Sequence, residues 1–331
     1  MDESLTLWCD AYASQLGARG AWVVDAVDTV DALSRLALVG EGVRLVVFMD
    51  DFADKLATAF ASCDLVLLDS PDPALFSAAV ADGTPSVWFV NTLGGFGWRV
   101  ADVRALSVSA RASGALLVVD NTVASCVGAD PLRQGAAVCL EALDRLAAGC
   151  AGSGGVAVSA AFDRRGRGRR TVVDPAAARA YEHLVSLELP LPKALDISQL
   201  AAGFSSLPAR MQARQDTARA LASYLAAHPR VAEVCYPGLA SHPDHVRASS
   251  LLMHGCGIAL DFHLDAVSAR EFVSSFLEQV PAEPAGGAAT RVYALTGRGP
   301  SWVRVFCGGE DAIALVDDFE RAILQACAMN R

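Results

Sequence analysis

The stretch Gly-Ala-Leu-Leu-Val-Val-Asp-Asn-Thr, residues 114–122, indicates the fold class of this chain. Five apolar residues in a row, closed by Asp-Asn-Thr, predict a short strand that is buried on both faces and ends in a polar turn. Ala101 to Ser113 shows the helical spacing of apolar residues and stops at Gly114, a residue type that commonly ends helices. A helix that leads directly into a buried strand is typical of a parallel sheet covered by helices.

The same alternation continues outward in both directions. Further apolar runs predict strands at residues 44–49, 65–68, 86–90 and 154–160. A long helix is expected from about residue 199 to 228, interrupted near Pro208, and strand and helix patterns then alternate to the end. We therefore expect an α/β fold, with a large domain over residues 1–227 that holds a mostly parallel sheet of the seven-strand type. A small α+β domain is expected over residues 228–331.

Composition excludes several classes of partner. The formal net charge is −10, whereas binding to phosphate backbones needs clustered Lys and Arg, so nucleic acid is not expected. The basic run at residues 164–170 is interpreted as a solvated loop. Nine cysteines without a C-x-x-C pair, and histidines without metal-ligand spacing, predict reduced thiols and no metal site. With no run of eighteen apolar residues and an acidic start, we expect a cytoplasmic protein without a membrane partner.

Three stretches resemble one known family. They are residues 114–122 with the following 131–136, residues 203–245, and residues 303–311; within the second, Tyr-Pro-Gly-Leu-Ala-Ser-His-Pro-Asp-His (236–245) is the most specific. They resemble the pyridoxal-phosphate enzymes of cysteine and methionine metabolism, which include cystathionine γ-synthase, cystathionine γ-lyase and the O-acylhomoserine sulfhydrylases. The resemblance runs from about residue 20 to the end. It implies the aminotransferase-like fold (fold type I), pyridoxal phosphate as the family cofactor, and a homodimer or tetramer.

The resemblance assigns roles to two positions near the first stretch. Asp120 matches the acidic residue that keeps the cofactor's pyridine nitrogen protonated; by itself it would be interpreted as the start of a turn. The Schiff-base lysine is expected about 25 residues later, where Arg145 stands. A guanidinium stays protonated at physiological pH, so it cannot act as the amine nucleophile. Ala142 and Asp144 replace hydroxyl residues expected to hold the phosphate. The resemblance thus implies a degenerate member with no covalently bound cofactor, in which Asp120 is vestigial.

Other cofactor contacts of the family also have altered counterparts. Asp28-Thr29 aligns loosely with the Gly-Met of a phosphate-binding helix N-terminus, where the Asp28 carboxylate would repel phosphate. The ring-stacking aromatic residue expected after Asp50-Asp51 falls on Ala53, and Phe52, one place off, is interpreted as a core residue. The Asn of the family's Pro-x-Asn-Pro stretch has no counterpart here, because its position falls near Gly94-Gly95. The amino-terminal arm that reaches the neighbouring subunit is expected to be absent.

One substrate contact of the family is retained. Arg304 matches the arginine that binds the α-carboxylate of the amino acid with both arms of its guanidinium. A structural ion pair with Glu310 or Asp311 is the open alternative. The chain contains only two lysines, Lys55 and Lys193, and both are interpreted as solvated surface residues.

Three hypotheses on function remain open. The first is a catalytically inactive homologue of the transsulfuration enzymes of methionine metabolism, a pseudoenzyme that serves as a scaffold, ligand-binding or regulatory subunit. Its partners would be a second copy of itself, an active paralogue or a small amino-acid-like ligand. The alternative is an active pyridoxal-phosphate lyase or transferase acting on O-acylhomoserine or cystathionine, with groups borrowed from a partner chain or from Lys193. The third is cofactor-free chemistry in the same cleft, for which the sequence offers no motif.

Overall fold

The computed structural model describes residues 3–48, 52–147, 154–161, 163–165, 171–265, 267–276 and 289–329. The Asp50-Asp51 pair therefore lies outside the described residues. The chain forms two compact units: the first holds residues 1–95 and 99–204, and the second holds residues 96–98 and 205–331. The domain limits of 1–227 and 228–331 stay a prediction.

A seven-stranded sheet forms the centre of the first unit, in the order β1-β9-β8-β7-β4-β2-β3. Strands β8, β7, β4, β2 and β3 pair in parallel, whereas β9 runs antiparallel to both of its neighbours. The mostly parallel sheet predicted from the sequence is confirmed. The strand bounds are β1 (Gly20–Val24), β2 (Arg44–Phe48), β3 (Asp64–Leu67), β4 (Ser86–Asn91), β7 (Leu116–Asp120), β8 (Val138–Ala142) and β9 (Val156–Ala160).

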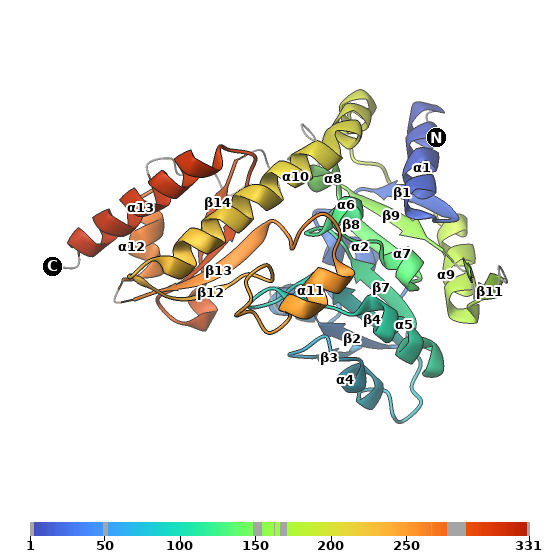
Figure 1. The fold of residues 1–331 in the computed structure, drawn as a ribbon. Helices are drawn as coiled ribbons and strands as arrows, with labels where there is room; N and C mark the ends of the chain where they lie inside the picture. Colours follow the sequence, from blue (N-terminus) through green and yellow to red (C-terminus); the bar gives the residue numbers. More distant parts are fainter. Residues whose placement is uncertain are drawn as a thin grey trace. The chain divides into compact units, whose positions relative to one another are not determined.

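Helices alternate with these strands along the chain (Figure 1). They are α1 (Glu3–Leu16), α2 (Thr29–Arg35), α3 (Ala53–Ala59), α4 (Pro73–Ala78), α5 (Val103–Ala112), α6 (Ser125–Gly128), α7 (Pro131–Gln134), α8 (Leu143–Leu146) and α9 (Pro175–Ser186). An aspartate accepts hydrogen bonds from the first backbone amides of α2, α4, α5, α7 and α9. Such caps satisfy N–H groups that a helix leaves unbonded, and they fix where each helix begins.

Two short hairpins complete the first unit. They are β5 (Leu93–Gly94) with β6 (Arg99–Val100), and β10 (Asp163–Arg165) with β11 (Thr171–Val173). The long helix α10 (Ile197–Ala227) then runs without a break, although Pro208 lies inside it. The interruption expected near Pro208 is wrong: a proline removes only one donor from the helical ladder, and the remaining turns continue on either side.

The second unit is built on an antiparallel four-stranded sheet in the order β12-β13-β15-β14. Its elements are β12 (Val231–Cys235), α11 (His245–Leu251), β13 (Ala259–Leu264), α12 (Ala269–Ser274), β14 (Arg291–Ala294), the 3₁₀ turn η2 (Thr296–Arg298), β15 (Trp302–Phe306) and α13 (Ala312–Met329). Phe262, Phe272 and Phe319 are fully buried in its core. Among the described residues of the whole chain, no helix is long and apolar enough to span a bilayer.

Candidate functional site

Asp120 is the last residue of β7 and lies at the carboxyl end of the parallel strands, where ligands of open α/β sheets commonly bind. Its side chain is buried, and both carboxylate oxygens are occupied within the chain. The Thr29 hydroxyl donates to Oδ2 at 2.6 Å, and the backbone N–H of Thr122 donates to Oδ1 at 2.8 Å. Burial raises the pKa of Asp120 above its ordinary value, although these two bonds and the charge of Arg145 act in the opposite direction.

Arg145 lies on α8, the single turn that follows β8. Its side chain is buried together with those of Leu143 and Leu146. The guanidinium lies close enough for its charge to lower the pKa of Asp120. The resemblance assigns this position to the Schiff-base lysine. It carries instead the buried, permanently charged guanidinium of Arg145, close to Asp120.

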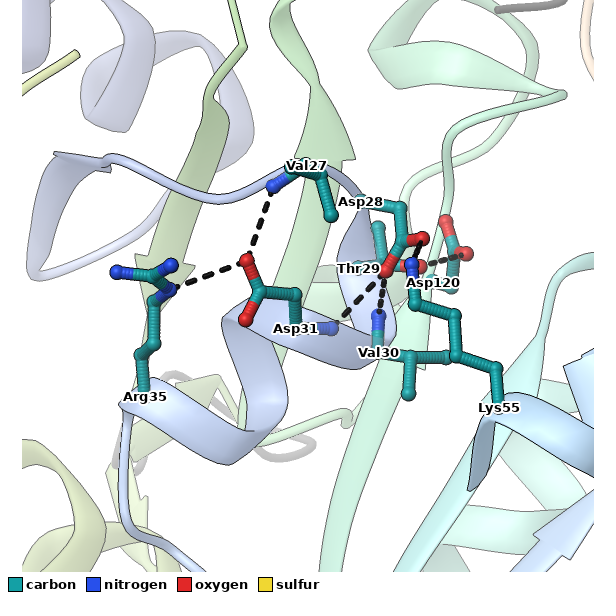
Figure 2. Close-up of polar contacts among 8 residues, drawn as sticks. All are labelled: Val27, Asp28, Thr29, Val30, Asp31, Arg35, Lys55 and Asp120. Carbon is teal, nitrogen blue, oxygen red and sulfur yellow. Dashed lines mark hydrogen bonds and ion pairs between the residues drawn. The ribbon is translucent and has the colours of Figure 1, made fainter. Parts of the chain in front are cut away.

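Asp28 and Lys55 form an ion pair at the start of α2. Asp28 Oδ1 accepts from the backbone amides of Val30 at 3.0 Å and Asp31 at 2.9 Å, so the side chain caps the helix. The Lys55 ammonium forms an ion pair with Asp28 Oδ2 (Figure 2). The side chain of Lys55 is 39% exposed and that of Asp28 is 23% exposed. Because Thr29 follows Asp28 directly, this ion pair and the Asp120 carboxylate belong to one site.

A second aspartate, Asp31, also forms polar contacts in the first turn of α2. Asp31 Oδ2 accepts from Arg35 Nε at 3.1 Å and from the Val27 N–H at 3.0 Å (Figure 2). Burial alone would raise the pKa of Asp31, but the hydrogen bonds from Arg35 and Val27 lower it below its ordinary value. The first turn of α2 is thus held by two aspartates, each tied to a cation of the chain.

Glu141 lies on β8 and is fully buried behind Asp120. Asn121 Nδ2 donates to its Oε1 at 2.6 Å. Burial raises the pKa of Glu141 to about 8, and the charge of Asp120 contributes in the same direction. Glu141 is not among the site residues predicted from the sequence. A glutamate inside the apolar run of residues 138–142 nevertheless indicates a buried acid.

Arg304 lies on β15 in the second unit, where it forms a bidentate ion pair with Asp261 of β13. Arg304 Nε donates to Asp261 Oδ1 and Nη2 donates to Oδ2, both at 2.8 Å. Both side chains are buried, and the guanidinium carbon lies 4.4 Å from the ring centroid of Trp98. The role of Arg304 toward a substrate carboxylate stays a prediction; the ion pair that the structure gives it is with Asp261.

Asp261 also binds the short segment of residues 96–98, which belongs to the second unit. It accepts hydrogen bonds from the Gly97 N–H and from Trp98 Nε1, each at 3.0 Å. On the other side, His242 Nε2 lies 2.6 Å from the Gly97 carbonyl oxygen. His242 Nδ1 accepts from the Asp244 N–H, which places the ring proton on Nε2 and makes the ring a donor to Gly97. Asp261 and His242 therefore both bind Gly97, the first through its N–H and the second through its carbonyl oxygen.

The remaining predicted residues take ordinary places. Phe52 precedes α3 and packs against the core of the first unit, as interpreted from the sequence. Gly95 has φ of 71°, and a Cβ there would lie 2.8 Å from the Phe48 ring, so only glycine suits this turn. Lys193 lies in an exposed stretch. The structure thus brings together Asp28, Thr29, Lys55, Asp120 and Arg145 within the first unit.

Comparisons with known proteins agree on one family. The model described as "Cys/Met metabolism PLP-dependent enzyme" matches residues 47–294. Chloroplastic cystathionine β-lyase of Arabidopsis thaliana is 30% identical over 171 residues, which cover 51% of this chain and 34% of the relative. A probable cystathionine γ-synthase of Herpetosiphon aurantiacus is 29% identical over 181 residues, 54% of this chain and 52% of the relative. The aligned part of this chain thus spans less than two thirds of the length of these curated relatives.

Solved structures extend the likeness over nearly the whole chain. Cystathionine γ-synthase from Xanthomonas oryzae pv. oryzae, solved in complex with cystathionine, superposes with a TM-score of 0.83 at 26% sequence identity. That match covers 99% of this chain and 87% of the other. The aminotransferase-like fold expected from the sequence is confirmed.

Proposed function

The chain belongs to the Cys/Met metabolism PLP-dependent enzyme family, and from this premise we propose that it is a member that does not carry out the family's lysine-dependent chemistry. It acts instead as a scaffold, ligand-binding or regulatory homologue of cystathionine γ-synthase-like enzymes. Pyridoxal phosphate supplies an aldehyde that a lysine amine must attack, and a ring that withdraws electrons from the bound amino acid.

The observation that carries this proposal is the buried Arg145 after β8. It occupies the position that the resemblance assigns to the Schiff-base lysine, and a guanidinium offers no neutral amine at physiological pH. The two lysines of the chain are Lys55 and Lys193. The first is ion-paired with Asp28, and the second lies in an exposed stretch.

The contacts at the start of α2 do not fit the phosphate of the family cofactor. The Asp120 oxygens accept one hydrogen bond each, from Thr29 and Thr122, and each keeps a lone pair, so the misfit does not lie at Asp120 itself. The amides of Val30 and Asp31 already bind the Asp28 carboxylate, which would also repel a phosphate.

A partner is part of the proposal. A second copy of the chain, joined through the large domain as a dimer, is the first candidate, with a tetramer, an active paralogue and a small amino-acid-like ligand as the others. Such a ligand would have to share Arg304 with Asp261, which accepts hydrogen bonds from Nε and Nη2 of the guanidinium. We place the protein in the cytoplasm, in keeping with the eight free thiols among the described residues.

Spectroscopy and turnover test the proposal together. Purified protein is incubated with pyridoxal phosphate, its absorbance spectrum is recorded, and borohydride is added before peptide mass analysis. We expect no absorbance band of a protein-bound cofactor, no stoichiometric lysine adduct, and no turnover of cystathionine or O-acylhomoserine above background. Turnover together with an adduct at Lys55 or Lys193 would contradict the proposal and support an active enzyme with relocated groups.

Light scattering at micromolar concentration tests the partner. A mass near twice the 34.5 kDa of one chain is the expected result. A mass near that of one chain would contradict self-association, and the second copy would no longer be a candidate partner.

A further inference from the structure

A cavity of about 660 Å³ lies in the second unit, between α12, α13 and the edge strand β14. Helix α12 contacts both α13 and β14 (Figure 1). The described residues that line the cavity include neither Asp120 and its neighbours nor the pair of Arg304 and Asp261. Pockets that bind small molecules commonly have volumes of about 300–1,000 Å³, so this cavity is large enough for a small ligand.

The walls of the cavity are largely apolar. The larger apolar side chains that line it are Val273 and Phe276 at the end of α12, Val292 on β14 and Leu315 on α13. Three of them, Val273, Phe276 and Val292, are only half-buried. A ligand with an apolar body would therefore remove apolar surface of the protein from water, which favours binding.

An acid lies at one end of the cavity. Both carboxylate oxygens of Glu310 accept hydrogen bonds from Thr290, one from its backbone N–H and one from its hydroxyl at 2.8 Å. The Thr290 hydroxyl accepts in turn from the Gly308 N–H at 2.9 Å. Within the described part of the chain, no cation forms an ion pair with Glu310. Neutral donors thus fix this carboxylate in the cavity, and each oxygen keeps a lone pair for a further donor.

Two arginines lie at the opposite end of the cavity. Arg270 follows Ala269, whose N–H donates to the Pro300 carbonyl just before β15, whereas Glu310 follows the other end of β15. Arg321 comes nine residues after the start of α13, which corresponds to about 14 Å along the helix. The cavity is therefore elongated, with the acid and the two guanidiniums at its two ends.

One of the two guanidiniums is left without an acid. Arg321 pairs with Asp318 at 3.0 Å, and both side chains are about half exposed. Arg270 is exposed and forms no ion pair with any residue that the structure describes. The cavity thus presents an unpaired anion at one end, an unpaired cation at the other, and apolar walls between them.

We propose that this cavity binds an ω-amino carboxylate, whose ammonium contacts Glu310, whose apolar chain lies along α13 and whose carboxylate contacts Arg270. The inference goes beyond the proposed function, because it concerns a different site. An α-amino acid carries both charges on one carbon atom, so it cannot reach both ends of the cavity. A short peptide has suitable ends, but its amide groups would be placed against apolar walls, which favours an alkyl chain.

Titration calorimetry of the full chain with ω-aminooctanoate tests the proposal. Octylamine lacks the carboxylate, octanoate lacks the ammonium, and ω-aminobutanoate is too short to span the cavity. We expect ω-aminooctanoate to bind at least about threefold more tightly than each of these three compounds, since a part-exposed ion pair contributes an effect of this size. Equal affinities for the four compounds, or no binding of ω-aminooctanoate at about 10 mM, would overturn the proposal.

Two variants assign the ends of the ligand. Glu310→Gln removes the fixed negative charge, and we expect it to weaken binding of ω-aminooctanoate and octylamine about tenfold while leaving octanoate unchanged. Arg270→Gln should weaken binding of ω-aminooctanoate and octanoate about threefold while leaving octylamine unchanged. Arg230→Gln is the matched control, because Arg230 is another exposed arginine of the second unit that does not line the cavity.

The Arg270 variant keeps the test decisive even if Glu310→Gln does not fold. Its side chain is exposed and makes no contact on which folding depends, so circular dichroism should show a native spectrum. An affinity for ω-aminooctanoate that is the same in wild type, Arg270→Gln and Arg230→Gln would overturn the proposed site.

Discussion

Two buried acids, one in each unit, have opposite surroundings. Asp261 on β13 and Glu141 on β8 are both fully buried on a strand. Asp261 accepts four hydrogen bonds, two of them from the permanently charged Arg304. Glu141 accepts a hydrogen bond from the neutral amide of Asn121, and burial raises its pKa to about 8. The charge of Asp261 in the second unit is thus neutralised by Arg304. Glu141 in the first unit is neutralised by binding a proton.

The largest effect is expected where a partner neutralises the acid. Replacing Arg304 by Met leaves the Asp261 carboxylate buried without its cation, and we expect the free energy of unfolding to fall by about 3–5 kcal/mol. Urea denaturation at pH 7 measures it. The control is Arg219→Met, which breaks a surface pair with Asp216 and should change stability by less than about 1 kcal/mol. A loss of similar size in both variants would favour the role of Arg304 toward a ligand.

The acid that is neutralised by a proton should respond to pH. Between its ordinary pKa and about 8, Glu141 binds a proton in the folded state but not in the unfolded state. Folding then becomes less favourable as the pH rises through this window. Glu141→Gln removes the titration, so we expect the variant to gain about 1 kcal/mol over wild type per pH unit from pH 5 to 8.

Urea denaturation of both proteins at several pH values checks this prediction. Tyr12, Cys126 and Cys139 also surround Glu141, but burial raises the pKa of each above its ordinary value, so none of them titrates between pH 5 and 8. The charge of Asp120, which raises the pKa of Glu141, is present in both proteins. A difference that is flat from pH 5 to 8 would mean that Glu141 is ionised in the folded state.

A third substitution tests how far Asp120 depends on a neutral donor. Thr29→Val keeps the shape of the side chain but removes the hydroxyl that donates to the buried Asp120 carboxylate. We expect a loss of about 2 kcal/mol in the free energy of unfolding. Thr58→Val, whose hydroxyl bonds a carbonyl on an exposed helix, should cost much less. Equal losses would show that the Thr29 hydroxyl is not needed to hold Asp120.

The smallest effect is expected for catalysis. Arg145→Lys places an amine beside Asp120, yet Asp28 still occupies the α2 amides and Thr29 still binds Asp120. The amine alone does not position a substrate for reaction while these contacts remain, so we expect no turnover of cystathionine above background. Steady-state assays of the variant and wild type decide it. Activity restored by this single substitution would mean that the first-unit site is open to the cofactor.

Local patterns predicted five strands of the large sheet, β2, β3, β4, β7 and β9, but not β1 or β8. The apolar run that ends at Asp120 is β7, and the helix before it is α5. The small size of α8 and the unbroken α10 could not be derived in this way. Whether a helix continues past a proline, or ends after one turn, depends on how its other residues pack, and periodicity does not report packing.

The sequence by itself determined the α/β class, the family, the acid at the end of β7, and the arginine that stands where the resemblance expects a lysine. Only the tertiary structure decided the partners of these groups. Arg304 pairs with Asp261, which is 43 residues away and which the sequence did not suggest. Lys55 pairs with Asp28, which is 27 residues away. Side-chain types and spacing specify local backbone structure, whereas ion pairs and burial arise only when the folded chain brings distant residues together.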